Sequence, residues 1–167
     1  CLRICQVLVL PPFQRKGLGS FMYTTACTAG QLGMAHDVYE LTVESPCAGF
    51  VRLRDAVDLD RFISMLLVDL DRHTRVKQSD LDAIMAQYPQ WTTALAGRVQ
   101  DCLHITKNQG RRCFEALQLA HSAELGEAAR KAARLSIKRR LYQKAALCAK
   151  EEGLIGEVRC GSQCQLS

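Results

Sequence analysis

A short basic segment with two glycines, near the N-terminus, contains the residue types that bind phosphate. Residues 14–20 read QRKGLGS, and they follow the apolar run QVLVL and two prolines. A predicted helix begins in this segment, and the free N–H groups and positive dipole of a helix N-terminus attract anions. Gly17 and Gly19 let a ligand approach the backbone closely, while Arg15 and Lys16 add positive charge. The segment therefore predicts a site for phosphate or pyrophosphate.

Known phosphate-binding motifs narrow this interpretation. The segment is not a P-loop, because no Gly-Lys-Ser/Thr closes it, and it lacks the third glycine of the dinucleotide fingerprint, whose place is taken by Met22. A tight strand-to-helix turn without a ligand stays open as an alternative, with Ser20 as a helix cap rather than a phosphate contact. The hexad Gln14–Gly19 also fits Gln/Arg-x-x-Gly-x-Gly/Ala, which resembles the acetyl-CoA pyrophosphate loop of the GNAT superfamily of N-acetyltransferases.

The elements that position this segment are predicted to be a strand, a helix, a second strand and a second helix. The β-branched run Arg3–Leu10 indicates a strand that ends at the two prolines. Helical spacing of apolar residues predicts a helix over Gly17–Gly33, and Val38–Glu44 is typical of a second strand. Ser45-Pro46 indicates an N-cap and a first-turn proline. The helix that follows is expected over Cys47–Asp55, with a possible extension to Leu70.

Helices alone are predicted in the rest of the chain. They cover Ser79–Gln87, Gln90–Leu103, Thr106–Ser122 and the Ala-rich, basic segment Glu124–Glu151. We therefore predict an α/β fold class, in which a partial α/β unit (residues 1–70) precedes an all-α C-terminal extension (residues 71–152). Residues 153–167 lack periodicity and are expected to form a disordered tail.

Composition and charge limit the classes of function. The chain has 167 residues, a net charge of +5 and no apolar run near the roughly 20 residues of a membrane span. Its nine cysteines have no zinc-ligand spacing, so we expect no metal. The first residues do not resemble a signal peptide, so we expect reduced intracellular thiols. No groove-reading motif predicts direct nucleic-acid binding. The basic segment IKRRL, with the nearby cations, is interpreted as a solvated face, a nuclear localisation signal or a contact for an acidic partner.

Four stretches, in order along the chain, resemble one family. QVLVLPPFQRKGLG and LTVESP…LRDAVD are similar to a strand, loop, strand and helix of the histone acetyltransferase type B catalytic subunits. GRRCFEALQL and RLSIKRRL resemble the C-terminal helices of that family. The resemblance runs from about Arg3 to Lys144 and implies a partial GNAT acyltransferase fold, with earlier strands and a histone-gripping domain upstream. We therefore expect the chain to be a fragment or an incomplete gene model.

The resemblance implies acetyl-CoA as co-substrate, no metal, and a role for each matched residue. The strand backbone pairs with the pantetheine arm at Val7, Leu8 and Val9. The pyrophosphate loop consists of Gln14, Arg15, Lys16, Gly17, Leu18, Gly19 and Ser20. Glu44, at the C-terminal end of the second strand, matches the general base; a solvated carboxylate or an aid to the Ser45 cap is the alternative. The family's Glu-Asp-Pro is Glu44-Ser45-Pro46 here, so any role of the aspartate is lost.

The implied function is acetyl transfer to a lysine in the tail of newly synthesised histone, with the histone-four tail as the first candidate. A WD-repeat histone chaperone is the implied partner, and the implied location is the nucleus and the cytoplasm. Two alternatives stay open. One is a non-catalytic fragment that acts as a protein-interaction module, and the other is a GNAT enzyme for another amine.

Overall fold

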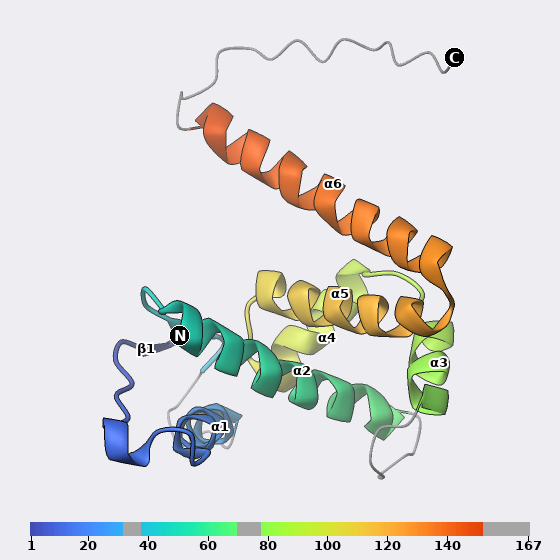
Figure 1. Cartoon of the computed structure of the whole chain (residues 1–167). Coiled ribbons are helices and arrows are strands. Elements are labelled where there is room, and N and C mark those ends of the chain that lie inside the picture. The colour runs from blue at the N-terminus through green and yellow to red at the C-terminus, as the bar shows by residue number, and fades with distance from the viewer. Residues whose placement is uncertain (32–37, 70–77, 152–167) are drawn as a thin grey trace.

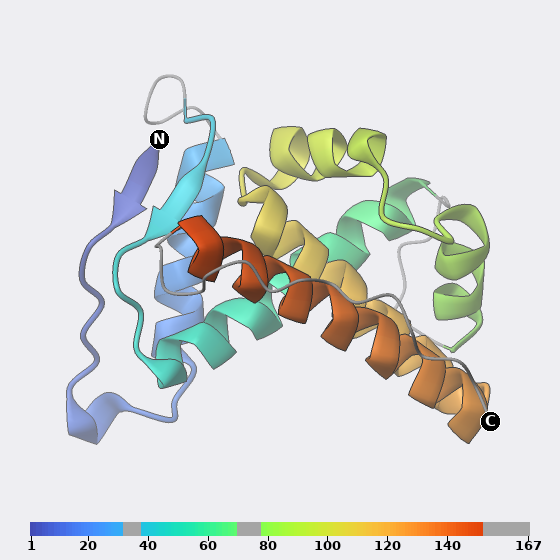
Figure 2. The same ribbon diagram turned by 90° about the horizontal axis from the view of Figure 1, so that it is seen from above.

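A computed structural model describes residues 1–31, 38–69 and 78–151 of the chain. The first part of the chain contains two short strands, a 3-10 helix and two α-helices, and the part after it is helical. The elements are β1 (Leu2–Ile4), η1 (Pro11–Phe13), α1 (Leu18–Gln31), β2 (Leu41–Val43), α2 (Ala48–Asp69), α3 (Gln78–Gln87), α4 (Thr93–Leu103), α5 (Lys107–Glu124) and α6 (Glu127–Glu151). The strands and α1 lie at one end of the molecule, α3 lies at the other, and α2 runs between them (Figures 1 and 2).

The two strands form a parallel pair, as expected for a strand–helix–strand unit. Leu2 is opposite Leu41 and Ile4 is opposite Val43. The backbone N–H of Glu44 donates to the Ile4 carbonyl at 3.0 Å, at the end of the pairing. The other edge of β2 meets the helical part of the chain, because Leu41 forms a parallel bridge with Ile105. This small sheet and the many helices are consistent with the predicted α/β class.

Both strands are shorter than predicted. The predicted strand Arg3–Leu10 is paired over Leu2–Ile4 alone, and the predicted strand Val38–Glu44 is paired over Leu41–Val43. A strand exists where a partner accepts its hydrogen bonds, and within the described residues the sheet has two strands. The run of β-branched residues therefore continues as extended chain beyond its partner, up to the prolines of η1.

The predicted helix cap at Ser45 is wrong. α2 begins at Ala48, and the N–H of Val51 donates to the Cys47 carbonyl at 2.9 Å. Ser45 has φ +40°, whereas an N-cap residue is in the extended region. The chain instead bends at Ser45, directly after Glu44, in a backbone conformation that residues other than Gly, Asn and Asp rarely adopt. The extension of this helix almost to Leu70 is confirmed.

The helices after α2 begin and end close to their predicted bounds. Threonine side chains cap two of them, since Thr92 Oγ1 accepts from the Leu95 N–H and Thr106 Oγ1 accepts from the Gln109 N–H, both at 3.1 Å. The long basic helix begins at Glu127 rather than Glu124, because Gly126 has φ +106° and separates it from α5. The tail predicted to be disordered, residues 153–167, lies outside the described residues.

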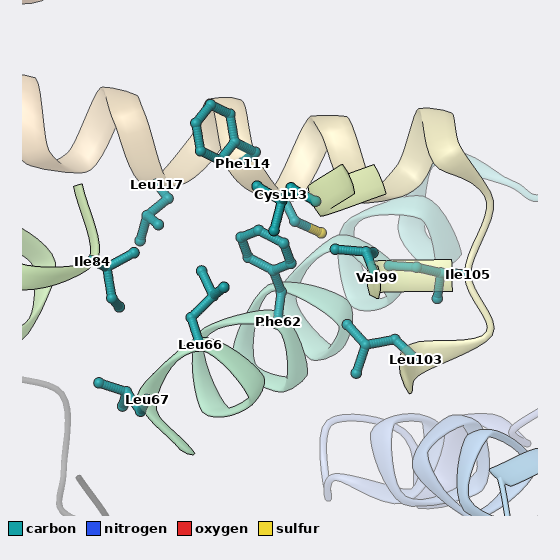
Figure 3. Close-up of a cluster of buried hydrophobic side chains, with 11 residues drawn as sticks. Phe62, Leu66, Leu67, Ile84, Val99, Leu103, Ile105, Cys113, Phe114 and Leu117 are labelled. Atoms are coloured by element: carbon teal, nitrogen blue, oxygen red, sulfur yellow. The ribbon is translucent and has the colours of Figure 1, made fainter. Parts of the chain in front are cut away.

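Two clusters of buried apolar side chains stabilise the fold, and α2 contributes to both. The larger one joins α2, α3, α4 and α5 around residues such as Phe62, Val99 and Phe114 (Figure 3). The smaller one joins α1, the strands and the first half of α2 around Tyr23, Cys27 and Leu41. Packing against α2 thus positions α1 and β2, which carry the glycine segment and Glu44. The division of the chain between residues 70 and 71 stays a prediction.

Replacing Gly110 with alanine is expected to destabilise the larger cluster. A Cβ atom at Gly110 would lie 2.7 Å from Val99 Cγ1 and 3.1 Å from the Trp91 ring. Because both neighbours are packed in the core, overpacking should lower the free energy of unfolding by about 1–3 kcal/mol. Urea denaturation would measure the change. Gly97→Ala is the matched control, since a Cβ there meets nothing within 4 Å; equal losses in both variants would contradict the expectation.

Within the described residues, no helix is both long and apolar enough to cross a bilayer. In the same part of the chain, seven cysteines are free thiols, and no group of three or more metal-binding side chains comes together.

Candidate functional site

Most of the residues nominated for cofactor binding line a single hollow of about 640 Å³. Its walls come from the extended segment after β1, from the turn before α1 and from the first turns of α2. The nominated residues in the lining are Val7, Leu8, Val9, Gln14, Arg15, Gly17, Leu18, Gly19 and Ser20. The tertiary structure thus brings the apolar strand extension and the glycine segment together around one space.

The backbone conformation of the turn before α1 explains why residue 17 is a glycine. Gly17 has φ +81° and Arg15 has φ +60°, so two positive-φ residues reverse the chain ahead of the helix. The N–H of Phe21 donates to the Gly17 carbonyl at 2.9 Å, so the N–H groups of Leu18, Gly19 and Ser20 precede this first turn of hydrogen bonds in α1. These three residues line the hollow, and their N–H groups can bind an anion.

Gly19, the second glycine of the segment, was expected to let a ligand approach the backbone, but the structure gives a packing reason for a glycine at this position. A Cβ atom at Gly19 would lie 2.8 Å from Leu53 Cδ1, on the facing side of α2. Gly19 therefore lets α1 and α2 approach each other closely, whether or not a ligand is bound. Both helices line the hollow, so their separation sets its width.

The nominated cations differ in position. Arg15 lines the hollow, whereas Lys16 does not, and Lys16 Nζ lies 5.7 Å from the centre of the Phe13 ring. Sequence reasoning missed Arg52, an exposed residue of α2 that lines the same hollow. Arg52 could have been nominated from its position near the start of the helix after β2, because the start of that helix lies beside the glycine segment.

A smaller hollow of about 210 Å³ contains Glu44 in its lining. It lies where the chain leaves β1 on one side and β2 on the other, and its lining includes Cys5, Gln6 and Ser45. The two hollows adjoin, since both are lined by Val7, Cys47 and Phe50. The nominated acid and the nominated cofactor residues therefore lie in two neighbouring hollows, with Cys47 in the lining of both.

The pairing of the two strands ends beside these hollows. After the last bond between Glu44 and Ile4, the chain from Cys5 to Leu10 continues without a partner strand in the described parts of the structure. Gln14 Nε2 donates to the Val9 carbonyl at 2.8 Å, which holds the extended segment against the turn. Val7 and Leu8 line the larger hollow, so a ligand with amide groups can occupy the space beside this extended backbone.

A buried polar cluster holds the elements of the site together. Asp58 of α2 is fully buried, and the Tyr23 hydroxyl of α1 donates to its Oδ1 at 2.9 Å. Arg54 Nε lies 3.4 Å from Asp58 Oδ2 and Arg61 Nη1 lies 3.5 Å from Asp58 Oδ1. Arg61 Nη2 also donates at 3.1 Å to the carbonyl of Leu103, at the end of α4. The cluster thus links α1, α2 and α4.

Burial sets the protonation of the two acidic groups in this cluster. It raises the pKa of the Tyr23 hydroxyl, and the neighbouring Asp58 carboxylate raises it further, so this hydroxyl stays a donor. Burial also raises the pKa of Asp58, while the Tyr23 hydrogen bond and the charges of Arg54 and Arg61 lower it in part. The carboxylate is thus held in the interior by its three partners.

Comparison with known proteins identifies relatives of this chain. No family model matches it. The histone acetyltransferase type B catalytic subunit of Arabidopsis thaliana is 33% identical over 120 residues, which is 70% of this chain and 25% of that protein. The protein of that name from Schizosaccharomyces pombe is 28% identical over 84% of this chain and 33% of its own length. That from Mycosarcoma maydis is 44% identical over 63 residues, which is 38% of this chain and 14% of that protein.

The match with the Arabidopsis and Schizosaccharomyces proteins extends over most of this chain. The chain spans about a quarter to a third of their length. The resemblance predicted from the sequence is therefore confirmed.

Proposed function

The chain is a sequence relative of the histone acetyltransferase type B catalytic subunits, and we propose that it carries the acetyl-CoA-binding half of a histone lysine acetyltransferase. Its first 70 residues would belong to a GNAT acyltransferase fold, and residues 71–152 would form the helical extension. In this proposal the larger hollow holds acetyl-CoA and the smaller one receives the substrate lysine.

One observation carries the proposal: the hollow of the nominated cofactor residues adjoins the hollow that contains Glu44. The N-terminus of α1 and Arg15 would bind the pyrophosphate, with Arg52 as a further cation on the facing helix. The backbone of Val7, Leu8 and Val9 would pair with the amides of the pantetheine arm. The arm would then lead toward Cys47 and the smaller hollow, where acetyl transfer would take place.

The chemistry that this arrangement supports is direct attack of a lysine amine on the thioester. A lysine side chain has a pKa of about 10.4, so near pH 7 it must lose a proton before it attacks. Glu44 would take that proton, directly or through a water molecule. A C–N bond forms as the C–S bond breaks. The attacking nitrogen then loses a second proton, which the departing thiolate takes up, so that coenzyme A leaves as the thiol. The exposure of Glu44 supports this role, because a lysine can reach it from solvent.

The substrate and partners are proposed from the names of the relatives and from the resemblance. We propose a lysine of a newly synthesised histone tail as the acceptor, with the histone-four tail first, and a WD-repeat histone chaperone as partner. The nucleus and the cytoplasm are the proposed locations. A protein-interaction module without catalysis is the second candidate, and Ser45 in place of the family aspartate favours it. A GNAT enzyme for another amine is a third.

Calorimetric titration of the purified chain with acetyl-CoA is the experiment that tests the proposal. Saturable binding followed by acetylation of a histone-tail peptide would support an acetyltransferase. Binding without transfer would favour the interaction module, and transfer to small amines in preference to the peptide would favour the third candidate. A folded chain that does not bind acetyl-CoA would overturn the proposal that the hollow is a cofactor site.

Replacing Ser20 with aspartate is expected to separate cofactor binding from folding. Ser20 lies in the first turn of α1, where a negative charge stabilises a helix. The same charge would repel a pyrophosphate at this helix end, so we expect acetyl-CoA to bind about tenfold or more weakly, while the midpoint of thermal unfolding stays equal or rises. Calorimetry and circular dichroism measure the two effects.

Thr24→Asp is the matched control for the Ser20 variant. Thr24 is exposed, lies one turn further along α1 and is outside the lining of the hollow. The affinity of this variant for acetyl-CoA should stay within about twofold of the unaltered chain, because the new charge lies outside the hollow and away from the free N–H groups of the helix N-terminus. Equal losses in the two variants would show that general charge repulsion, and not the helix N-terminus, governs binding.

A further inference from the structure

The outer face of α6 is a basic and apolar surface that the proposed acetyl transfer does not use. α6 packs on α5, and its outer side is open to solvent among the described residues (Figure 1). We call the outward-facing residues Lys131, Leu135, Lys138 and Tyr142 the α6 strip. They follow one another at steps of four, three and four residues and therefore share one face of the helix.

The opposite face of α6 is held on the molecule, which makes the α6 strip a fixed surface. Ala129, Ala133 and Ile137 are partly buried on the side that faces α5. Arg140, on the same side, forms two hydrogen bonds with the Glu115 carboxylate, from Nε at 2.5 Å and from Nη2 at 2.7 Å. A two-pronged ion pair of this kind fixes orientation as well as position. The strip is thus presented by a helix whose rotation is set.

The charges on α6 differ from those of an ordinary solvated helix face. Exposed cations lie along it at Arg130, Lys131, Arg134, Lys138, Arg139 and Lys144. From residue 128 to residue 149 the sequence contains no acidic residue, and Glu127 is paired with Arg130 at 3.7 Å. A solvated helix usually alternates signs at steps of four residues, whereas Arg130, Arg134 and Lys138 repel one another at that spacing. An acidic partner would remove this repulsion.

Exposed apolar side chains lie among these cations. Tyr142 is 75% exposed and Leu135 is 43% exposed, both within the α6 strip. Nucleic-acid backbone would neutralise the cations but would give Leu135 no apolar surface to pack on. An acidic amphipathic helix offers both, with leucines to pack on Leu135 and Tyr142 and carboxylates to pair with the lysines of the strip.

We propose that the α6 strip is a docking surface for an acidic, amphipathic protein segment. It lies on the helical extension, and the binding would be independent of acetyl-CoA. The cations of the strip require an acidic partner, and Leu135 and Tyr142 require that this partner also presents apolar side chains.

The test is fluorescence anisotropy with the full chain and three labelled probes. The first is a peptide that places leucines on one face of a helix and glutamates beside them, the second is poly-glutamate, and the third is duplex DNA. We expect the amphipathic peptide to bind most tightly and its affinity to fall as salt rises from about 0.05 to 0.3 M. Duplex DNA binding as tightly as the peptide would overturn the assignment to a protein partner.

Charge reversal tests the location of the surface. Lys131→Glu with Lys138→Glu should weaken peptide binding about tenfold or more. This variant should keep its helix, because the carboxylate introduced at position 138 would form a favourable pair with Arg134 at a four-residue step. Arg3→Glu with Lys107→Glu is the matched control, since it changes the net charge equally at exposed positions away from α6. Unchanged binding in the α6 variant, or equal loss in the control, would overturn the proposal.

Removal of the apolar groups tests the form of the partner. Leu135→Ser with Tyr142→Ser keeps every charge of α6, and we expect it to weaken binding of the amphipathic peptide several-fold while poly-glutamate binding stays the same. Equal effects on both probes, or no effect on the peptide, would contradict an amphipathic partner.

Discussion

Replacing Glu44 with glutamine is expected to lower the rate of acetyl transfer to a lysine peptide by about a hundredfold or more. Glutamine has the size of glutamate but cannot accept the proton of the lysine ammonium group. The affinity for acetyl-CoA should stay the same, because Glu44 lines the smaller hollow and not the larger one. Steady-state kinetics with a histone-tail peptide would measure the loss in kcat, and calorimetry would measure the affinity.

The dependence of this loss on pH distinguishes a general base from a structural residue. As the pH approaches about 10.4, a growing share of substrate lysine is already deprotonated, so the base becomes less necessary. The ratio of the unaltered rate to the variant rate should therefore fall as pH rises. A structural defect would lower the rate by the same factor throughout.

Glu40→Gln is the matched control for the Glu44 variant. Glu40 directly precedes β2, at the end opposite Glu44, and its backbone carbonyl accepts from the Leu2 N–H at 2.8 Å. A side-chain change there leaves this bond in place and lies outside the lining of both hollows. We expect a rate within about twofold of the unaltered chain. Similar rates for Glu44→Gln and the unaltered chain would contradict the general-base role.

Replacing Asp58 with alanine is expected to lower the free energy of unfolding by about 3–5 kcal/mol. The change would leave the Tyr23 hydroxyl and the guanidinium groups of Arg54 and Arg61 in a buried site without their shared carboxylate. Urea denaturation followed by circular dichroism would measure the loss. Because Asp58 links α1 to α2, the variant should also bind acetyl-CoA more weakly at temperatures where it is still folded.

Two further variants define the origin of the Asp58 effect. Tyr23→Phe removes one hydrogen bond and leaves both ion pairs, so its cost should be about 1–2 kcal/mol. Asp60→Ala is the matched control, because Asp60 is exposed on the same helix, and its cost should be about 0.5 kcal/mol or less. A cost for Asp58→Ala as small as that of Asp60→Ala would contradict the account of a buried ionic cluster.

Local patterns in the sequence were sufficient for most of the helices and for the order of the elements. The predicted bounds of α3, α4 and α5 agree with the structure within a few residues, because caps such as Thr106 act within one turn. The glycine segment could be nominated for the same reason: its residue types and its place between a strand and a helix are local features.

Long-range contacts decided what the local patterns left open. Strand length depends on a partner, so the run of β-branched residues up to Leu10 did not reveal that pairing ends at Ile4. The helical spacing of Leu18 and Met22 predicted a helix but not its buried face, which consists of Tyr23, Cys27 and Gly30. That face is selected by α2 and β2, which are distant in sequence.

The candidate site, too, was predicted in part from local sequence patterns and decided in part by long-range contacts. Residue types nominated Glu44 and the segment from Gln14 to Ser20, since carboxylates accept protons and helix N-termini bind anions wherever they occur. The tertiary structure placed these groups in two neighbouring hollows, added Arg52 to the larger one and left no room for a Cβ atom between Gly19 and Leu53. Those features depend on the distance between α1 and α2, and that distance is set by side chains such as Tyr23 and Asp58 that meet only when the chain folds.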